Sequence, residues 1–196
     1  MDERIFFDNL SATWDDNEML STSERVNHIL DFIDLKPGQS VLDLGTGTGV
    51  LLPYIAERVG LKGQITAVDY STGMLKRAEE KFSSLKPKPE FLNLDIENET
   101  IPGEFDRIIM YCVYPHLHTP IETLKWLINV NLKSDGILTI AFPCSQNFIN
   151  NIHKEKHAES DNLPPAEILA DIMRSSGINA NVVSDTEESY VINISK

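Results

Sequence analysis

The stretch that most constrains the fold is residues 41–49, where a short apolar run containing one acid leads into glycine at every second position. The apolar run predicts a buried strand, and the apolar pattern of residues 50–56 predicts a helix after it. A glycine turn between a strand and a helix lets a ligand approach the backbone, because no Cβ stands in the way. The free N–H groups at the helix start point at the same place. The sequence therefore predicts a ligand site at this turn.

An acid follows the next predicted strand at the distance that a nucleoside site requires. Residues 65–68 form a second apolar run, and Asp69 ends it twenty positions after Gly49. In a βαβ unit, an acid at the tip of the second strand accepts hydrogen bonds from ribose hydroxyls. We therefore expect a cofactor that contains a nucleoside.

The glycine spacing and the acid before it separate two classes of cofactor. A dinucleotide site has the pattern G-x-G-x-x-G, but here Val50 stands where the third glycine belongs. Asp43 would repel a pyrophosphate and attract an ammonium group. S-adenosylmethionine has no phosphate and carries an ammonium and a sulfonium, so it fits better. The alternative is that Asp43 caps the turn and the glycines only shape the joint between strand and helix.

Composition and charge favour a small-molecule partner over nucleic acid. The 196 residues, 41% of them hydrophobic, are enough for one domain with one core. The formal net charge is -13, and the clustered Lys and Arg that phosphate backbones attract are missing. Two cysteines, Cys112 and Cys144, give no disulfide framework and fit a reducing compartment. With neither a long apolar run nor a basic leader, we expect a cytoplasmic protein that spans no membrane; oligomeric state is left open.

Strands and helices alternate along the chain, which predicts a doubly wound α/β sheet. The last two strands are joined by a link too short for a crossover helix, so they read as a hairpin. Ser23 is the expected N-cap of the first long helix, and residues 133–136 are the expected turn before the fifth strand. The predicted strands are 41–44, 65–69, 91–94, 105–111, 137–142, 180–183 and 190–194. The predicted helices are 23–35, 50–56, 72–85, 121–132 and 165–173, with a further helical pattern within 145–161.

These segments together resemble the successive motifs of class I S-adenosylmethionine-dependent methyltransferases. The resemblance rests on residues 41–49, Asp69 with Ser71 and Met74-Leu75, Asp95, Phe105-Asp106, and residues 132–136. It implies a Rossmann-like doubly wound seven-stranded sheet in the order 3-2-1-4-5-7-6, with the last strand antiparallel and helices on both faces. It also implies one methyltransferase domain over residues 23–196, with S-adenosyl-L-methionine bound at the carboxyl ends of the first strands.

The same resemblance implies which residues contact the cofactor. Asp43 and the glycine turn would hold the methionine part, Asp69 the ribose, and Met74 one wall of the adenine pocket. Asp95 would accept the adenine amino group beside the Ile96 backbone. Two alternatives stay open, namely that Asp95 caps a turn and that Met74 is ordinary core packing. The full set of expected cofactor contacts is Asp43, Gly45, Thr46, Gly47, Gly49, Asp69, Tyr70, Met74, Asp95, Ile96, Tyr111 and Cys112.

The expected catalytic residues are Tyr111, His116 and His153. Tyr111 and His116 lie at and after the fourth strand, where the resemblance places the transferred methyl group, and His153 lies on a predicted helix. A general base is needed only if the acceptor must lose a proton early. His118 and His157 are expected to be surface residues. His116 and His153 could together bind a metal, but no cysteine or acid falls at a ligand spacing, so no metal is expected.

A narrower resemblance points to a prokaryotic branch that acts on small molecules. It rests on Pro115-His116-Leu117, Ser145, Asn150, His153 and Leu163-Pro164-Pro165. That branch often has histidine and arginine after the fifth strand, where this chain has Phe142 and Gln146.

Three functional hypotheses follow from these observations. They are a methyltransferase for a small molecule, a cofactor-binding module with lost or altered catalysis, and a nicotinamide-dependent oxidoreductase. Val50, Asp43 and the absence of a Tyr-x-x-x-Lys pair speak against the third.

Residues 1–22 form an acidic opening with aromatic side chains and no clean period. One interpretation is a helix packed on the edge of the domain. The other is a lid that closes over cofactor and substrate and excludes water during the transfer. For the lid we expect five aromatic side chains to converge near the methyl group: Phe7, Trp14, Tyr111, Tyr114 and His116.

Overall fold

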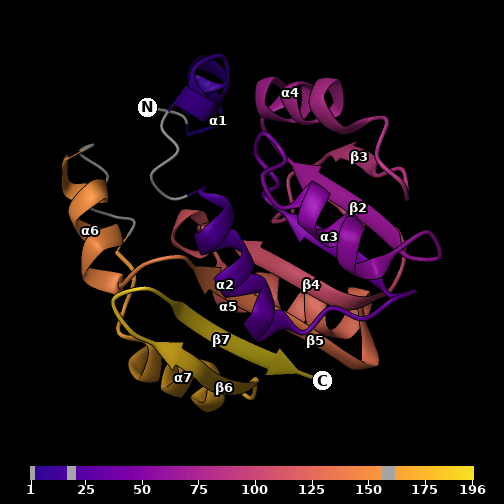
Figure 1. Cartoon of the computed structure of the whole chain (residues 1–196). Helices are drawn as coiled ribbons and strands as arrows, with labels where there is room; N and C mark the ends of the chain where they lie inside the picture. The colour runs from indigo at the N-terminus through magenta and orange to yellow at the C-terminus, as the bar shows by residue number, and fades with distance from the viewer. Residues whose placement is uncertain (1–2, 17–20, 156–161) are drawn as a thin grey trace.

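A computed structural model describes residues 3–16, 21–155 and 162–196, apart from the side chains of Glu3, His153 and Glu155. Its centre is a seven-stranded sheet in the order β3-β2-β1-β4-β5-β7-β6 (Figure 1). Neighbouring strands from β3 to β5 run parallel, and β7 runs antiparallel to both β5 and β6. This confirms the predicted fold class and strand order. The strands are β1 Ser40–Leu44, β2 Gln64–Asp69, β3 Glu90–Asn93, β4 Phe105–Tyr111, β5 Leu132–Phe142, β6 Asn179–Asp185 and β7 Tyr190–Ser195.

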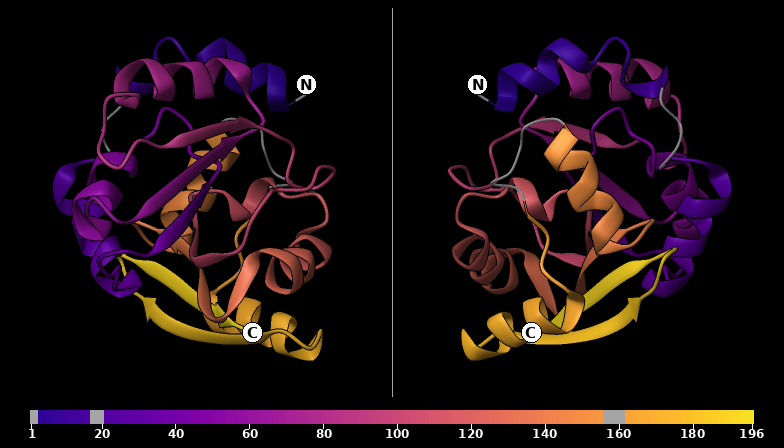
Figure 2. Two further views of the ribbon diagram at one scale, coloured as in Figure 1. Left: turned by 90° about the vertical axis from the view of Figure 1, so that its right-hand side faces the viewer. Right: turned by 90° about the vertical axis from the view of Figure 1, so that its left-hand side faces the viewer.

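Helices cover both faces of the sheet (Figures 1 and 2). On one face, α2 and α3 pack on alternate side chains of the strands, including Val41, Ile65 and Ile109. On the other face, α5 and α7 pack on the intervening side chains, so both faces are buried as a parallel sheet requires. The helices are α1 Glu3–Leu10, α2 Ser23–Ile33, α3 Leu52–Val59, α4 Thr72–Phe82, α5 Pro120–Trp126, α6 Gln146–Glu155 and α7 Ala166–Ser175, with short helical turns η1 Trp14–Asp16, η3 Tyr114–His116 and η4 Leu127–Asn131.

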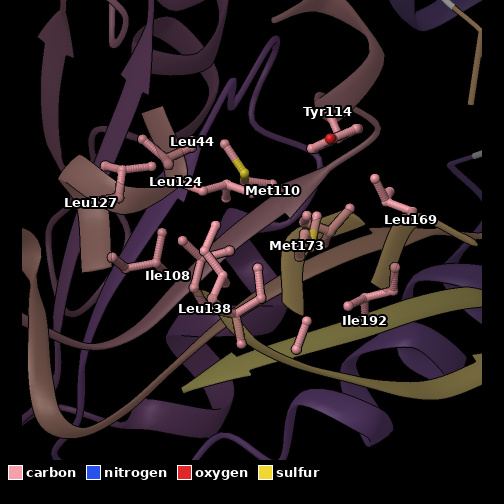
Figure 3. Close-up of a cluster of buried hydrophobic side chains, with 14 of the residues drawn as sticks. Leu44, Ile108, Met110, Tyr114, Leu124, Leu127, Leu138, Leu169, Met173 and Ile192 are labelled. Carbon is pink, nitrogen blue, oxygen red and sulfur yellow. The ribbon is translucent and has the colours of Figure 1, made fainter. Parts of the chain in front are cut away.

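The larger core lies between the sheet and the pair α5 and α7 (Figure 3). Leu44, Ile108 and Leu138 are fully buried there, and α7 contributes Met173. Tyr114, just past β4, is also part of this core. The core fixes the strands at their centre and leaves the loops at the carboxyl ends available for a site.

The structure corrects the predicted start of α2 and the predicted start of β5. The N-cap of α2 is Thr22, whose hydroxyl accepts the Arg25 N–H, and Ser23 is the first helical residue. Helical backbone covers the predicted helix 121–132 almost to its end, but after Trp126 it is a π-helical turn, η4, which leads directly into β5. Residues 133–136 therefore belong to β5 instead of forming a separate turn, and Leu132 already pairs with Phe105 across a bulge. The side chains at the start of β5 are polar and partly exposed, so the sequence pattern there is typical of a turn and not of a strand.

The N-terminal residues 3–16, here called the N-terminal strap, lie along α4 near the carboxyl end of the sheet (Figures 1 and 2). The Asp8 carboxylate accepts hydrogen bonds from the Ser71 hydroxyl at 2.6 Å and the Gly73 N–H at 2.9 Å, at the start of α4. These two bonds lower the pKa of Asp8. Asp15 accepts hydrogen bonds from Thr48 in the glycine turn and from Lys81 in α4. The strap thus joins the glycine turn to α4.

In the part of the chain that the structure describes, no helix combines the length and the apolar character needed to cross a membrane.

Candidate functional site

The glycine turn after β1 is held in a left-handed backbone conformation at each of its three glycines. Gly45 has φ +64°, and a Cβ there would approach Val113 Cγ2 to 2.5 Å. Gly49 has φ +86°, and its Cβ would meet the Phe82 ring at 2.8 Å. These two glycines are therefore required by packing within the protein as well as by backbone conformation.

Gly47 is different, because nothing lies within 4 Å of where its Cβ would stand, although its φ is +55°. Its N–H donates to an oxygen of the Asp69 carboxylate at 2.8 Å. The outer face of the turn at Gly47 is thus bare backbone, next to a buried acid. This is the arrangement that lets a ligand lie against the main chain.

Asp69 lies at the carboxyl end of β2 and is 7% exposed. One oxygen accepts the Gly47 N–H, and the other accepts the Ser71 N–H at 2.8 Å. Burial raises its pKa to about 6, against these two hydrogen bonds, and the nearby Asp8 charge adds to the rise. Each carboxylate oxygen can accept a further hydrogen bond. The side chain can therefore receive the two hydroxyls of a ribose, as the sequence predicts.

Asp43 is still more buried, at 1% exposure, inside β1. Its carboxylate accepts the Thr46 hydroxyl at 2.7 Å. Burial raises its pKa to about 7, the Thr46 hydrogen bond opposes the rise, and the charge of Asp69 contributes to it. A buried acid with so little compensation is costly to keep ionised in the protein alone. A cationic group bound nearby would favour the ionised form.

Asp95, the predicted partner of the adenine amino group, makes the turn contacts that the sequence left open as its alternative role. Its carboxylate accepts the Glu97 N–H at 3.0 Å and the Asn98 side-chain amide at 2.8 Å. Both oxygens keep acceptor capacity, so contact with an adenine amino group stays a prediction, as does the Ile96 backbone contact. Met74, at 2% exposure, is buried at the start of α4, and its place beside adenine is likewise a prediction.

The turn after β4 approaches the glycine turn through Val113, which packs against Gly45. Cys112 has φ +60°, a conformation that costs energy for a residue with a Cβ. Burial, with a contribution from nearby Cys144, raises the pKa of the Cys112 thiol far above its usual range. Burial also raises the pKa of Tyr111 far above its usual range, with smaller effects of Cys112 and Cys144 in the same direction. Both groups are therefore neutral at physiological pH, so Tyr111 can form hydrogen bonds but cannot serve as an ionised base.

Aromatic side chains from the strap, from the residue just after β2 and from the turn after β4 meet around Phe7. Its ring centroid lies 5.6 Å from that of Trp14, 5.4 Å from that of His116 and 6.1 Å from that of Tyr70. Phe7, Trp14 and His116 thus gather as expected, and Tyr70 joins them. Tyr114 does not, since it packs in the core beneath α5 and α7 (Figure 3). Tyr111, the fifth residue of the expected group, is buried in the core on the α2 and α3 face.

The structure places His118 at the surface and leaves the side chains of His153 and His157 undescribed. His118 has a ring 78% exposed, paired with Glu97. The backbone of His153 lies in α6, but its side chain lies outside the described part, as does the whole of His157. A catalytic role for His153 is therefore still a prediction. Among the described residues, no three His, Cys, Asp or Glu side chains gather as a metal site would require.

Sequence reasoning missed several polar residues around the site. Asp8 and Asp15 of the strap, Thr48 of the glycine turn and Glu97 after β3 each join segments that are distant in sequence. The sequence holds no local signal for them, because single acids in an acidic chain look alike until the fold places their partners.

Known proteins share this architecture and sequence pattern. A family model described as a methyltransferase domain matches residues 35–186. The chain is similar to (S)-coclaurine N-methyltransferase from Thalictrum flavum subsp. glaucum, with 29% identity over 80% of this chain and 41% of that protein. It is also similar to 2-phytyl-1,4-naphtoquinone methyltransferase from a Nostoc species, with 33% identity over 55% of this chain and 50% of the relative. The chain thus spans half or less of the length of these two curated relatives.

Among solved structures, a SAM dependent methyltransferase from Aquifex aeolicus aligns with a TM-score of 0.75 and 25% identity. The alignment covers 95% of this chain and 97% of that one. Here the similarity extends over nearly the full length of both chains.

Proposed function

The chain belongs to the methyltransferase domain family, and from this premise we propose that it transfers a methyl group from S-adenosylmethionine to a small-molecule acceptor. The observation that supports this best is the bare backbone at Gly47 beside the buried Asp69. A ligand with ribose hydroxyls and no phosphate satisfies both features.

The residues present fit this cofactor. Asp43 would hold the ammonium of the methionine part, since a cation nearby offsets the burial of its carboxylate. Asp69 would accept the ribose hydroxyls while keeping its bonds to Gly47 and Ser71. Asp95 and Ile96 would flank the adenine, with Met74 on its apolar side. The other proposed contacts are Gly45, Thr46, Gly49, Tyr70, Tyr111 and Cys112.

The chemistry asks the protein mainly for alignment and exclusion of water. When bound, the cofactor supplies a methyl group already activated by the positive sulfonium. Phe7, Trp14 and Tyr70 would shield the acceptor from water, and the neutral Tyr111 hydroxyl would orient it by hydrogen bonding. His116 would accept a proton from acceptors that must lose one, since a neutral imidazole has a ring nitrogen that can act as a general base. His153 is a second candidate for that step.

We further propose that residues 1–22 act as a lid on a methyltransferase domain of residues 23–196. Supporting this, Asp8 and Asp15 attach the strap to α4 and the glycine turn, while Phe7 adds an aromatic surface. The acceptor is proposed to be neutral or cationic, because a net charge of -13 disfavours anions and nucleic acid. The two cysteines, both reduced, suit a cytoplasmic location.

Calorimetry with S-adenosylhomocysteine and with NAD tests the cofactor. We expect binding of the first and none of the second; the reverse result would overturn the proposal. A panel of amines, phenols and quinols, followed by detection of S-adenosylhomocysteine as product, then tests turnover. Binding without turnover on every acceptor would favour a module that binds cofactor but has lost catalysis.

A further inference from the structure

The Glu97 carboxylate joins two loops that flank the proposed cofactor site. One oxygen accepts the His118 N–H at 3.0 Å and lies 3.0 Å from His118 Nδ1. The other accepts the Thr119 N–H at 2.6 Å and the Thr119 hydroxyl at 2.8 Å. Four polar contacts from one side chain thus bridge segments more than twenty residues apart in sequence.

These contacts between Glu97 and the pair His118 and Thr119, here called the Glu97 bridge, lie beside two residues of the proposed site. Glu97 stands two residues after Asp95, in the loop that follows β3, and its own N–H is bound by Asp95. His118 stands two residues after His116, in the loop that follows β4. The same carboxylate therefore connects the proposed adenine contact with the proposed proton acceptor.

The bridge is built to hold its geometry. The Glu97 side chain is only 13% exposed, although its partner ring of His118 is 78% exposed. Partial burial would raise the pKa of Glu97, but the hydrogen bonds from His118 and Thr119 outweigh it and lower the pKa below its usual value. Glu97 is therefore ionised at neutral pH, and hydrogen bonds to an ionised acceptor are the stronger ones.

We infer that Glu97 is a positioning residue, which fixes the loop bearing Asp95 and the loop bearing His116 at one separation and so shapes the pocket between them. This inference rests on the proposed function, because it concerns the same site. Glu97 acts through its neighbours and contacts neither the reacting atoms nor the cofactor.

A matched control exists at the opposite end of the sheet. The Asp106 carboxylate also accepts a backbone N–H and a hydroxyl, both from Ser40, and pairs with the cationic Lys133. It therefore makes the same kinds of contact far from the proposed cofactor site. A loss that reflects only general destabilisation would appear equally in variants of Glu97 and of Asp106.

The test compares Glu97→Ala, Glu97→Gln and Asp106→Ala with the wild type. Calorimetry measures the affinity for S-adenosylhomocysteine well below each melting temperature. Hydrogen exchange follows residues 94–101 and 113–120. We expect Glu97→Ala to weaken binding by about tenfold or more and to speed exchange in both loops, because every bridging contact is lost. Glu97→Gln, which keeps one acceptor oxygen, should fall between Glu97→Ala and the wild type.

Asp106→Ala should melt at a lower temperature yet bind within about twofold of the wild type. Wild-type affinity in Glu97→Ala, or an equal loss in Asp106→Ala, would overturn the inference. If Glu97→Ala does not fold, Glu97→Gln decides by the same two measurements. Failure of the wild type to bind S-adenosylhomocysteine would instead count against the proposed function.

Discussion

Carboxylates lie at both ends of strand β1, and their surroundings lower the pKa at one end and raise it at the other. At the amino end, Asp106 accepts hydrogen bonds from Ser40 and Lys133, which lower its pKa although partial burial opposes them. At the carboxyl end, burial raises the pKa of Asp43 to about 7 and that of Asp69 to about 6. At the amino end, the protein itself therefore stabilises the ionised carboxylate. At the carboxyl end, burial disfavours the ionised forms of Asp43 and Asp69, so a bound ligand that carries a cation or hydrogen-bond donors would stabilise them, as in a binding site.

The sharpest test of this difference is Gly47→Val. A branched side chain would project into the open space at the carboxyl end, where the ligand should touch the backbone. We expect binding of S-adenosylhomocysteine to be lost in calorimetry. Because φ is +55°, the free energy of unfolding should also fall, by about 1–2 kcal/mol. Normal binding would show that the turn is only structural.

Asp69→Ala should weaken binding of S-adenosylhomocysteine by about 2–3 kcal/mol, the scale for leaving polar groups unpaired. Because each 1.4 kcal/mol is tenfold, the dissociation constant should rise by about 30- to 140-fold. Calorimetry at pH 7.5 measures it. An unchanged dissociation constant would remove Asp69 from the ribose site.

At the amino end of β1, Asp106→Ala should lower the stability of the protein and leave its cofactor affinity unchanged. It leaves the Ser40 N–H without its acceptor and the Ser40 hydroxyl with only the longer bond to the Glu104 carbonyl, so unfolding in urea should require about 1–3 kcal/mol less free energy. Cofactor affinity should stay near the wild-type value. A large loss of affinity would mean that the two ends are not independent.

The raised pKa values at the carboxyl end of β1 should also make the stability of the protein depend on pH. Between its unfolded pKa near 4 and its folded pKa of about 7, Asp43 holds a proton in the native state that the unfolded chain releases. Stability without cofactor should therefore fall as pH rises through this window, by up to about 1.4 kcal/mol per pH unit. Asp69 adds to the slope up to about pH 6.

Asp43→Asn removes its share of this slope and should leave a flatter curve between pH 6 and 7. Urea unfolding at pH 5, 6, 7 and 8 measures both proteins. A wild type that becomes more stable from pH 5 to 7 would contradict the raised pKa values.

The smallest effect is expected in the strap. Asp15→Asn weakens the pair with Lys81, which lies at 2.8 Å and is largely exposed, so stability should change by less than about 1 kcal/mol. Hydrogen exchange in residues 3–16 should nevertheless become faster, and cofactor should slow it in the wild type. Lys36→Met, which breaks the exposed pair with Asp34, is the control and should leave exchange in the strap unchanged. Equal exchange in all three proteins would make the strap ordinary edge packing.

The sequence by itself determined the order of strands and helices, the glycine turn and the acid after β2. These are local patterns, because apolar periodicity and glycine at positive φ act within a few residues. The prediction from the sequence placed the start of β5 too late, because pairing with β4 keeps residues 133–136 extended although their polar side chains favour a turn.

The tertiary structure alone decided the charge state of the site and what holds it together. The raised pKa of Asp43 comes from burial among strands, which no spacing in the sequence reveals. Glu97 meets His118, and Asp8 meets Ser71, across 21 and 63 positions of sequence. Tyr70 joins Phe7 only because the strap lies beside α4. Such contacts depend on how distant segments pack, so they exist only once the chain has folded.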